Sequence, residues 1–138
     1  MQHSEKTVDE LILSFIEVLA NSNEKFIDMC RNLETKKSVA TVIRDLEFRN
    51  YESGKRLELY IEATTKTNKS VCWFVDCSFE MSSLSVTGKV YLTDDLGQNL
   101  IQEYPDFCTA SIGDFIDNFK KVISLIENSI NLFDFDFL

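Results

Sequence analysis

The longest regular pattern in the chain is an alternation of apolar and polar positions over residues 71–81, which resumes over residues 84–93. Because successive side chains of a β-strand point to opposite faces of a sheet, this period of two predicts neighbouring strands with one buried face. The side chains expected to be buried are Val71, Trp73, Val75, Cys77, Phe79 and Met81, followed by Leu84, Val86, Val90 and Leu92. Their alternates are expected to face outward, among them Phe74, Asp76, Glu80, Thr87 and Tyr91.

Apolar positions at helical spacing predict two helices before these strands. The first spans residues 7–20, where Thr7 and Glu10 have the spacing of a capping box. A shorter helix is predicted over residues 23–34, because the polar residues 21–23 break the pattern and supply a fresh N-cap.

A third helix is predicted near the end of the chain. It follows a capping signature at Ser111 and Asp114 and continues as a strongly amphipathic pattern to about residue 131. The tail, residues 133–138, alternates phenylalanine with aspartate. It is consistent with a last edge strand, with docking onto the helices, or with insertion into an apolar, basic cleft of a partner.

Further strands are expected on both sides of the central pair. The β-branched content of residues 39–48 favours a strand, and residues 56–64 alternate clearly. The inward side chains of the latter would be Leu57, Leu59, Ile61 and Ala63. After a turn over residues 93–99, a short strand is expected over residues 100–104, ending at Pro105 because proline has no N–H for a ladder.

These elements together predict an α+β fold. Consecutive strands joined by short polar turns make an antiparallel meander of about four to five strands. The N-terminal and C-terminal helices would cover one face of this sheet. With no repeat, linker or low-complexity segment, residues 1–138 are interpreted as a single domain.

Charge is unevenly distributed along the chain. The formal net charge is −9, and residues 94–138 contain nine acids and two bases. Nucleic acids and anionic membranes attract cationic surfaces, so this balance argues against both as direct partners. A basic protein partner and plain solubility are both compatible with it.

The start of the chain and its cysteines bear on localisation. No basic start leads into an apolar stretch, and no apolar run approaches the ~20 residues that span a bilayer, so a cytoplasmic protein is expected. Cys30, Cys72, Cys77 and Cys108 form no CxxC pair and are interpreted as free thiols in a reducing compartment.

No motif for catalysis, metal or cofactor binding is visible, so no enzyme activity, metal or cofactor is expected. The single histidine leaves little basis for a triad or a zinc site. Asp94 and Asp95 could join Glu103 or Asp106 around a cation, but they lack the spacing of a calcium loop, and a solvated turn is favoured.

The outward face of the sheet carries the candidate site. Tyr60, Phe74 and Tyr91 come from three successive strands and are interleaved with Glu58, Glu62 and Asp76. Aromatic anchors dominate many interfaces, and carboxylates steer cationic partners, so these six residues with Asp94 and Asp95 are the expected partner-binding residues. The alternative is that this face is an ordinary solvated sheet surface. Its carboxylates would then form ion pairs across strands with Arg56 or Lys89.

The order of these elements resembles small bacterial immunity proteins. It is a capped helix, an antiparallel meander, the segment 97–105 (GQNLIQEYP) and a serine-capped amphipathic helix. The similarity is to immunity proteins of contact-dependent growth-inhibition and other polymorphic toxin systems. It implies a cytoplasmic protein that neutralises the toxic C-terminal domain of a cognate effector, often a nuclease, by stoichiometric and non-catalytic binding. A monomer in a one-to-one complex is then expected.

Two other classes of function stay open. Acidic α/β proteins of this size also act as secretion chaperones, and a long apolar groove or a self-complementary edge strand would favour that class. A small enzyme or ligand-binding domain with a pocket between helix and sheet is the third class. The scarcity of polar residues pointing inward counts against it.

Overall fold

The computed structural model describes residues 8–51, 54–80 and 83–137. This part of the chain forms three α-helices, six strands and a short 3₁₀ helix. Their bounds are α1 Val8–Asn21, α2 Asn23–Glu34, β1 Val39–Tyr51, β2 Gly54–Thr65, β3 Ser70–Glu80, β4 Ser83–Asp94, β5 Gly97–Glu103, β6 Phe107–Thr109, α3 Ile112–Leu132 and η1 Phe135–Phe137.

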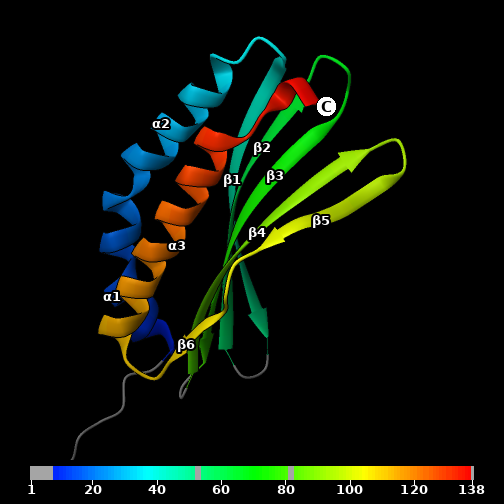
Figure 1. Cartoon of the computed structure of the whole chain (residues 1–138). Helices are drawn as coiled ribbons and strands as arrows, with labels where there is room; N and C mark the ends of the chain where they lie inside the picture. The colour runs from blue at the N-terminus through cyan, green and yellow to red at the C-terminus, as the bar shows by residue number, and fades with distance from the viewer. Residues whose placement is uncertain (1–7, 52–53, 81–82, 138) are drawn as a thin grey trace, which may run out of the picture.

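The strands form one antiparallel sheet in the order β1-β2-β3-β4-β5, and β6 pairs with the first part of β4. All three helices lie on the same side of this sheet, with α2 beside β1 and α3 across the middle (Figure 1). The expected α+β meander, covered on one face by N-terminal and C-terminal helices, is confirmed. None of the helices in the described ranges has the length and apolar character needed to cross a membrane.

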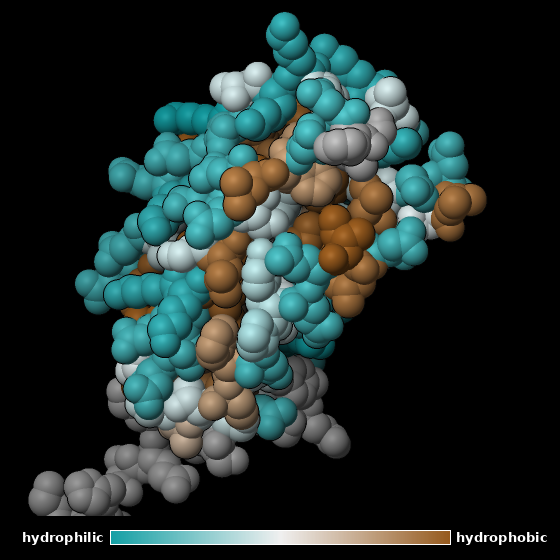
Figure 2. All heavy atoms as spheres, viewed as in Figure 1, coloured by the Kyte–Doolittle hydropathy of each residue, from teal (hydrophilic) through white to brown (hydrophobic). Residues whose placement is uncertain are grey.

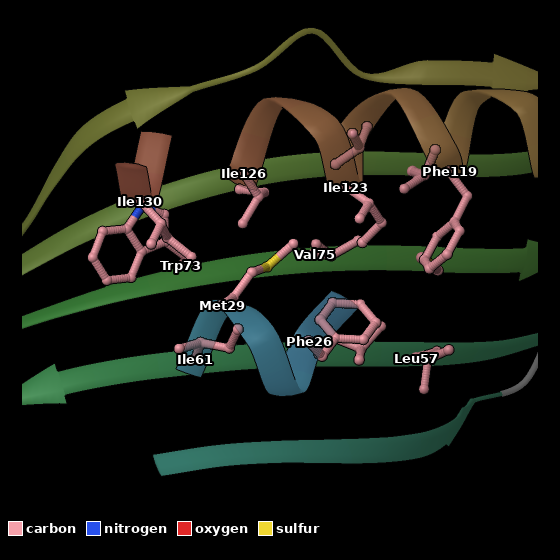
Figure 3. Close-up of a cluster of buried hydrophobic side chains, with 14 of the residues drawn as sticks. Phe26, Met29, Leu57, Ile61, Trp73, Val75, Phe119, Ile123, Ile126 and Ile130 are labelled. Carbon is pink, nitrogen blue, oxygen red and sulfur yellow. The ribbon is translucent and has the colours of Figure 1, made fainter. Parts of the chain in front are cut away.

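The core lies between the sheet and the helices. Figure 3 shows Phe26 and Met29 of α2, and Phe119, Ile123 and Ile126 of α3, reaching toward the strands. The inward side chains expected for β2, β3 and β4 are buried, except that Leu92 is half-buried and Met81 lies outside the described residues. Period-two patterning therefore identified the buried face of the sheet correctly.

Aromatic contacts hold α1 in place at one end of the core. The ring of Phe15 lies 5.6 Å from Phe79 of β3, 5.3 Å from Phe115 and 4.7 Å from Phe119 of α3. Phe15, Phe79, Phe115 and Phe119 are all fully buried. The edge-on geometry of two of these pairs is favourable for aromatic rings, so α1 is fixed against both the sheet and α3.

Of the N-caps expected for α2 and α3, only that of α3 is present. The Ser111 hydroxyl accepts a hydrogen bond from the Asp114 N–H at 3.3 Å, as expected for the cap of α3. The expected N-cap at the start of α2 is wrong, because the Ser22 hydroxyl instead donates to the Val18 carbonyl at 2.8 Å. The backbone at Ser22 is still helical, so α1 runs almost directly into α2. The capping box at Thr7 lies outside the described residues.

The β4–β5 connection is tighter than expected. The turn expected over residues 93–99 is present but spans only residues 95 and 96, because Asp94 pairs with Gly97 and the two strands continue from there. Asp94 accepts the Leu96 N–H at 2.8 Å, and Gly97 adopts a φ of 116°, which glycine tolerates best. The following strand thus begins at Gly97 and ends at Glu103, so Tyr104 is not part of it.

Tyr104 carries the chain from β5 to β6 across Gly88. Its N–H donates to the Gly88 carbonyl at 2.9 Å and its hydroxyl donates to the Leu125 carbonyl of α3 at 3.3 Å. A Cβ on Gly88 would lie 2.9 Å from the Tyr104 ring and 3.2 Å from Val122 and Ile126. Glycine at this position lets the helix, the strand and the tyrosine ring approach closely. Strand β6, which follows, was not expected from the sequence.

The acidic, aromatic tail docks onto the core and does not form an edge strand. Phe133 and Phe135 approach the Trp73 ring with centroid distances of 5.7 and 6.3 Å, and Phe135 is buried. Asp134 accepts the Asp136 N–H at 2.9 Å, which closes the turn. The two rings are therefore used inside the molecule, as the docking interpretation expected.

Candidate protein-binding face

The surface of the sheet that points away from the helices is called the outer face. Residues paired across antiparallel strands share a face, so the registers define its composition. Asp45, Tyr60, Phe74 and Lys89 form one cross-strand row. The row on one side of it contains Ile43, Glu62, Cys72, Tyr91 and Leu100, and the row on the other contains Glu47, Glu58, Asp76 and Thr87.

The three aromatic residues expected at the site are in contact. The Phe74 ring lies 5.5 Å from the Tyr60 ring at an interplanar angle of 37°, and 5.5 Å from the Tyr91 ring at 89°. Tyr60, Phe74 and Tyr91 are called the aromatic cluster below. Each is half-buried, because neighbouring side chains on the strands cover part of each ring. The cluster is therefore a packed, pre-formed surface and needs little ordering on contact with a partner.

The carboxylates around the aromatic cluster are partly neutralised. Arg56 donates to Asp76 through Nε at 2.8 Å and through Nη2 at 2.7 Å. Arg49 and Arg56 also approach Glu58, at 3.6 and 4.0 Å. The expected cross-strand pairing with Arg56 is therefore confirmed for Asp76, whereas Arg56 and Glu58 belong to the same strand. It also explains how Glu58 and Asp76 can sit directly opposite each other, since like charges in that position repel.

A pocket of about 200 Å³ opens next to the aromatic cluster. Its walls are Phe74 and Tyr91 on one side and the carboxylates of Glu58 and Asp76 on another. Lys89 and Gln98 complete its lining. Aromatic faces and carboxylates both attract cations, so this lining suits a guanidinium or ammonium group.

Two ionisable side chains on the outer face are shifted toward their neutral forms. Burial, and then the Glu62 carboxylate, raise the pKa of the Cys72 thiol to about 12. Burial, and then the charge of Asp45, raise the pKa of the Tyr60 hydroxyl. Tyr60 also donates a long hydrogen bond of 3.5 Å to Asp45. Near neutral pH both groups are therefore uncharged, and the negative charge of this region belongs to the carboxylates.

Six of the eight expected binding residues share the outer face, and two do not. Glu58, Tyr60, Glu62, Phe74, Asp76 and Tyr91 lie on the three central strands in adjacent rows. Asp94 and Asp95 lie at the tip of the β4–β5 hairpin, which projects away from the helices (Figure 1). Because Asp94 caps the Leu96 N–H, its side chain is engaged in the turn.

Sequence reasoning missed the contribution of β1. Asp45 and Glu47 extend the outer face by one strand and lie opposite Tyr60 and Glu58. A signal was present, because Ile43, Asp45, Glu47 and Arg49 alternate with the mostly apolar residues between them. Arg44 interrupts that alternation, since it lies on the helix side of the sheet and donates to Asn23 at 2.8 Å.

The acidic residues considered as metal ligands do not converge. Within the described ranges, no three histidine, cysteine, aspartate or glutamate side chains lie close enough together to hold a metal ion. Asp94 and Asp95 belong to the tight turn described above. The outer face presents aromatic surface, carboxylates and a small pocket.

Comparison with family models, with curated proteins and with solved structures gave no match for this chain.

Proposed function

We propose that the protein is an immunity protein that binds the toxic C-terminal domain of a cognate effector and blocks it without catalysis. The observation that carries this proposal is the aromatic cluster, pre-formed on the outer face and bordered by carboxylates on both sides. The basic toxin domain would contact this face through one partner molecule per chain.

Charge supports a basic partner. The chain has 23 acids against 14 bases, and the rows flanking the aromatic cluster contain Glu47, Glu58, Glu62 and Asp76. A nuclease active site is itself cationic, because it must hold a phosphodiester. Carboxylates presented on a rigid sheet can occupy such a site in place of phosphate, and their field speeds the encounter of the two proteins.

Aromatic surface supports a tight complex. Tyrosine supplies a large contact area at low entropic cost and is over-represented among residues that dominate binding energy, and phenylalanine is enriched in the cores of interfaces. The pocket beside Phe74 and Tyr91 can accept one arginine or lysine of the toxin between aromatic faces and the carboxylates of Glu58 and Asp76. That cation would compete with Arg56, which occupies the Asp76 carboxylate in the free protein.

The test uses the C-terminal domain of the product encoded immediately upstream of this chain, which the proposal identifies as the toxin. Cells producing that domain should survive when wild-type protein is co-produced. Survival should be lost with Glu62→Lys, which reverses a charge in the row of Tyr91. Glu17→Lys is the matched control, because Glu17 is an exposed acid on α1, on the opposite side of the molecule. Protection by Glu62→Lys equal to wild type would show that the outer face is not the inhibitory surface.

A second candidate function is a secretion chaperone that binds an unfolded effector segment. One observation favours it, namely the exposed edge strand β1 with Leu46 and Phe48 at its surface. The two functions differ in the state of the partner. An inhibitor binds the folded toxin domain, whereas a chaperone binds an unfolded segment of the effector and has no effect on the folded enzyme.

A further inference from the structure

Strand β1 lies at one edge of the sheet. Its edge away from β2 pairs with no other strand in the described part of the chain. It is 13 residues long and pairs with β2 without irregularity from Thr41 to Tyr51. The opposite edge, β5, has only 7 residues, and its pairing with β4 is interrupted between Val90 and Tyr91. A long, regular edge is a template for another strand, whereas a short, irregular edge is a poor one.

The middle of β1 is apolar and uncovered on the helix side. Helix α2 begins at Asn23 beside Arg44 and ends five residues before β1 begins, so it covers only the first half of this strand. Leu46 and Phe48 follow Arg44 on the same side and have exposed fractions of 41% and 51%. Large apolar side chains on an exposed edge strand favour association.

The backbone hydrogen bonds of β1 limit how another strand can pair with it. The Leu46 N–H bonds to Asp45 Oδ1 at 2.7 Å. This N–H therefore points to the free edge, and even-numbered residues of β1 direct their backbone groups there. In the single chain the Asp45 carboxylate occupies the Leu46 N–H, so a second strand has to displace it. In an antiparallel ladder, residues that exchange hydrogen bonds lie opposite each other. A second copy of β1 must then place even-numbered residues opposite even-numbered residues.

Charge and apolar contact together distinguish the registers that this rule allows. Placing Phe48 opposite its own copy would set Glu47 against Arg49 twice, but it would leave each Leu46 opposite Asn50 and form a single apolar pair. Placing Leu46 opposite its own copy would set Asp45 against Glu47 twice. Placing Leu46 opposite Phe48 sets Asp45 against Arg49 twice and joins the apolar pair twice. This register is unfavourable at one point, because the two Glu47 carboxylates meet on the two-fold axis and repel each other. Arg49 of the same chain lies 3.1 Å from each Glu47 carboxylate and offsets part of this repulsion. This register complements both charge and hydrophobicity, so the strand is complementary to itself.

We infer that β1 pairs antiparallel with β1 of a second copy of this chain, about a two-fold axis at Glu47. The pair Leu46–Phe48 of each half lies on the helix side, and the pair Asp45–Arg49 lies on the outer face. An interface of this kind is isologous and closes on itself, so it yields a dimer and not a fibre.

A pocket beside the edge fits this arrangement. It measures about 290 Å³ and lies between the α1–α2 junction and β1, with Leu19, Phe26, Leu46 and Leu59 among its lining residues. In the paired register, Phe48 of the second copy lies across from Leu46 and next to this pocket. Filling it would remove apolar surface of both copies from water, which stabilises the dimer.

The dimer has a consequence for the outer face. A two-fold axis perpendicular to the sheet keeps the helices of both copies on one side and both outer faces on the other. Two aromatic clusters would then share one continuous surface, so the assembly could hold two partner molecules at once. This inference does not depend on the identity of the partner, because it concerns the free protein.

Sedimentation of the full chain over a range of concentrations tests the dimer. Wild type should show a monomer–dimer equilibrium. Asp45→Arg and Arg49→Asp should each weaken dimerisation by about tenfold or more, and the double variant should recover most of that loss because the ion pairs are re-formed in reverse. A wild-type protein that sediments as a monomer throughout, or a dimer indifferent to both single variants, would overturn the inference.

A cysteine test fixes the register. On the axis, Glu47 and its copy form a pair without mutual hydrogen bonds, at a Cα separation of about 4.5 Å, which suits a disulfide. In a Cys108→Ser background, which removes the exposed thiol, Glu47→Cys should give a covalent dimer on mild oxidation. Asp45→Cys is the matched control and should remain largely monomeric. Crosslinking by Asp45→Cys in preference to Glu47→Cys would contradict the register.

Discussion

The Arg56 guanidinium bonds the Asp76 carboxylate through two parallel hydrogen bonds of 2.7 and 2.8 Å. Asp76 has a side-chain exposed fraction of 15% and Arg56 one of 46%, so the pair lies partly in solvent. A bidentate pair has well-defined geometry, but its exposure limits its contribution to stability to about 0.5–1 kcal/mol. Its larger effect is on the field of the outer face, because it masks a carboxylate next to the aromatic cluster.

Replacing Arg56 should therefore change binding more than folding. Arg56→Gln removes a positive charge from the outer face, and we expect the association rate with a basic partner to rise by a factor of about 2 to 5 at low salt. Lys25→Gln is the matched control, because it removes the same charge from an exposed position on α2. Stopped-flow measurements of the association rate check this prediction. Equal association rates for the two variants would show that the outer face does not take part in binding.

The single tryptophan is tied to α3 by one hydrogen bond. Trp73 Nε1 donates to Ser129 Oγ at 3.0 Å, and Trp73 is almost fully buried. Ser129→Ala leaves the indole N–H without this acceptor, so the free energy of unfolding should fall by about 1–3 kcal/mol. Ser124→Ala, at an exposed position on the same helix, should change it by less than about 0.5 kcal/mol. Urea titrations followed by tryptophan fluorescence compare the two, and equal stabilities would contradict the role of this bond.

The tail provides a second pair of variants. Phe135 is 6% exposed and packs against Trp73 and Phe133, whereas Leu132, three residues earlier, is 84% exposed. Phe135→Ala should lower the free energy of unfolding by about 2–4 kcal/mol, and Leu132→Ala by less than about 0.5 kcal/mol. Thermal unfolding would measure both. A stable Phe135→Ala protein would indicate that the tail does not dock in solution and is available to a partner.

Alkaline pH should destabilise the fold through Cys72. Its pKa is raised from 9.0 to about 12 by burial and by Glu62. Above pH 9 the unfolded chain releases this proton while the folded chain keeps it, so stability is fully present below pH 9 and is lost as pH rises toward 12. The slope is at most about 1.4 kcal/mol per pH unit for one thiol.

Variants separate this thiol from the others. Cys77 is fully buried and its pKa is also raised by burial, so Cys72→Ala should reduce the alkaline loss of stability without abolishing it. Urea titrations at several alkaline pH values measure the slopes, and an identical slope for Cys72→Ala would refute the assignment.

Much of the sheet and its helices was predictable because side-chain period alone determines which residues are buried. Trp73, Val75 and Phe79 alternate with polar neighbours, and Phe115, Phe119 and Val122 recur at helical spacing. Local chemistry was less informative. Ser22 has the residue type of an N-cap, yet it donates to Val18, because α1 and α2 are nearly continuous there. The three-residue strand β6 has too short a pattern to be recognised.

The residues of the outer face were predictable from the sequence, but the ion pairs that neutralise part of its charge were not. Alternation placed Tyr60, Phe74 and Tyr91 on one surface, and the structure brings their rings into contact. The masking of Asp76 by Arg56 depends on the register between β2 and β3, which period alone does not specify. Charge predicts Asp94 and Asp95 as additional contact residues, and the structure places them in the tight turn at the hairpin tip, apart from the aromatic cluster.

One exposed apolar region lies on the β4–β5 hairpin, away from the helices. In Figure 2 the helical side is mostly hydrophilic, and hydrophobic atoms gather over the β4–β5 hairpin. The exposed apolar residues of this hairpin are Leu96, Leu100 and Ile101. Leu100 shares a row with Tyr91, so the outer face extends into this hairpin. A partner that covers the aromatic cluster would reach Leu100 as well.

The central claim is that the outer face binds a basic partner through the aromatic cluster. The most direct measurement is calorimetric titration of the C-terminal domain of the product encoded immediately upstream with wild type, Phe74→Ala and Leu132→Ala, each at low and high salt. We expect one toxin domain per chain, affinity that falls with salt, a loss of about 2 kcal/mol or more of binding energy for Phe74→Ala and none for Leu132→Ala. Wild-type affinity for a folded Phe74→Ala protein, or the absence of binding by wild type, would contradict the account.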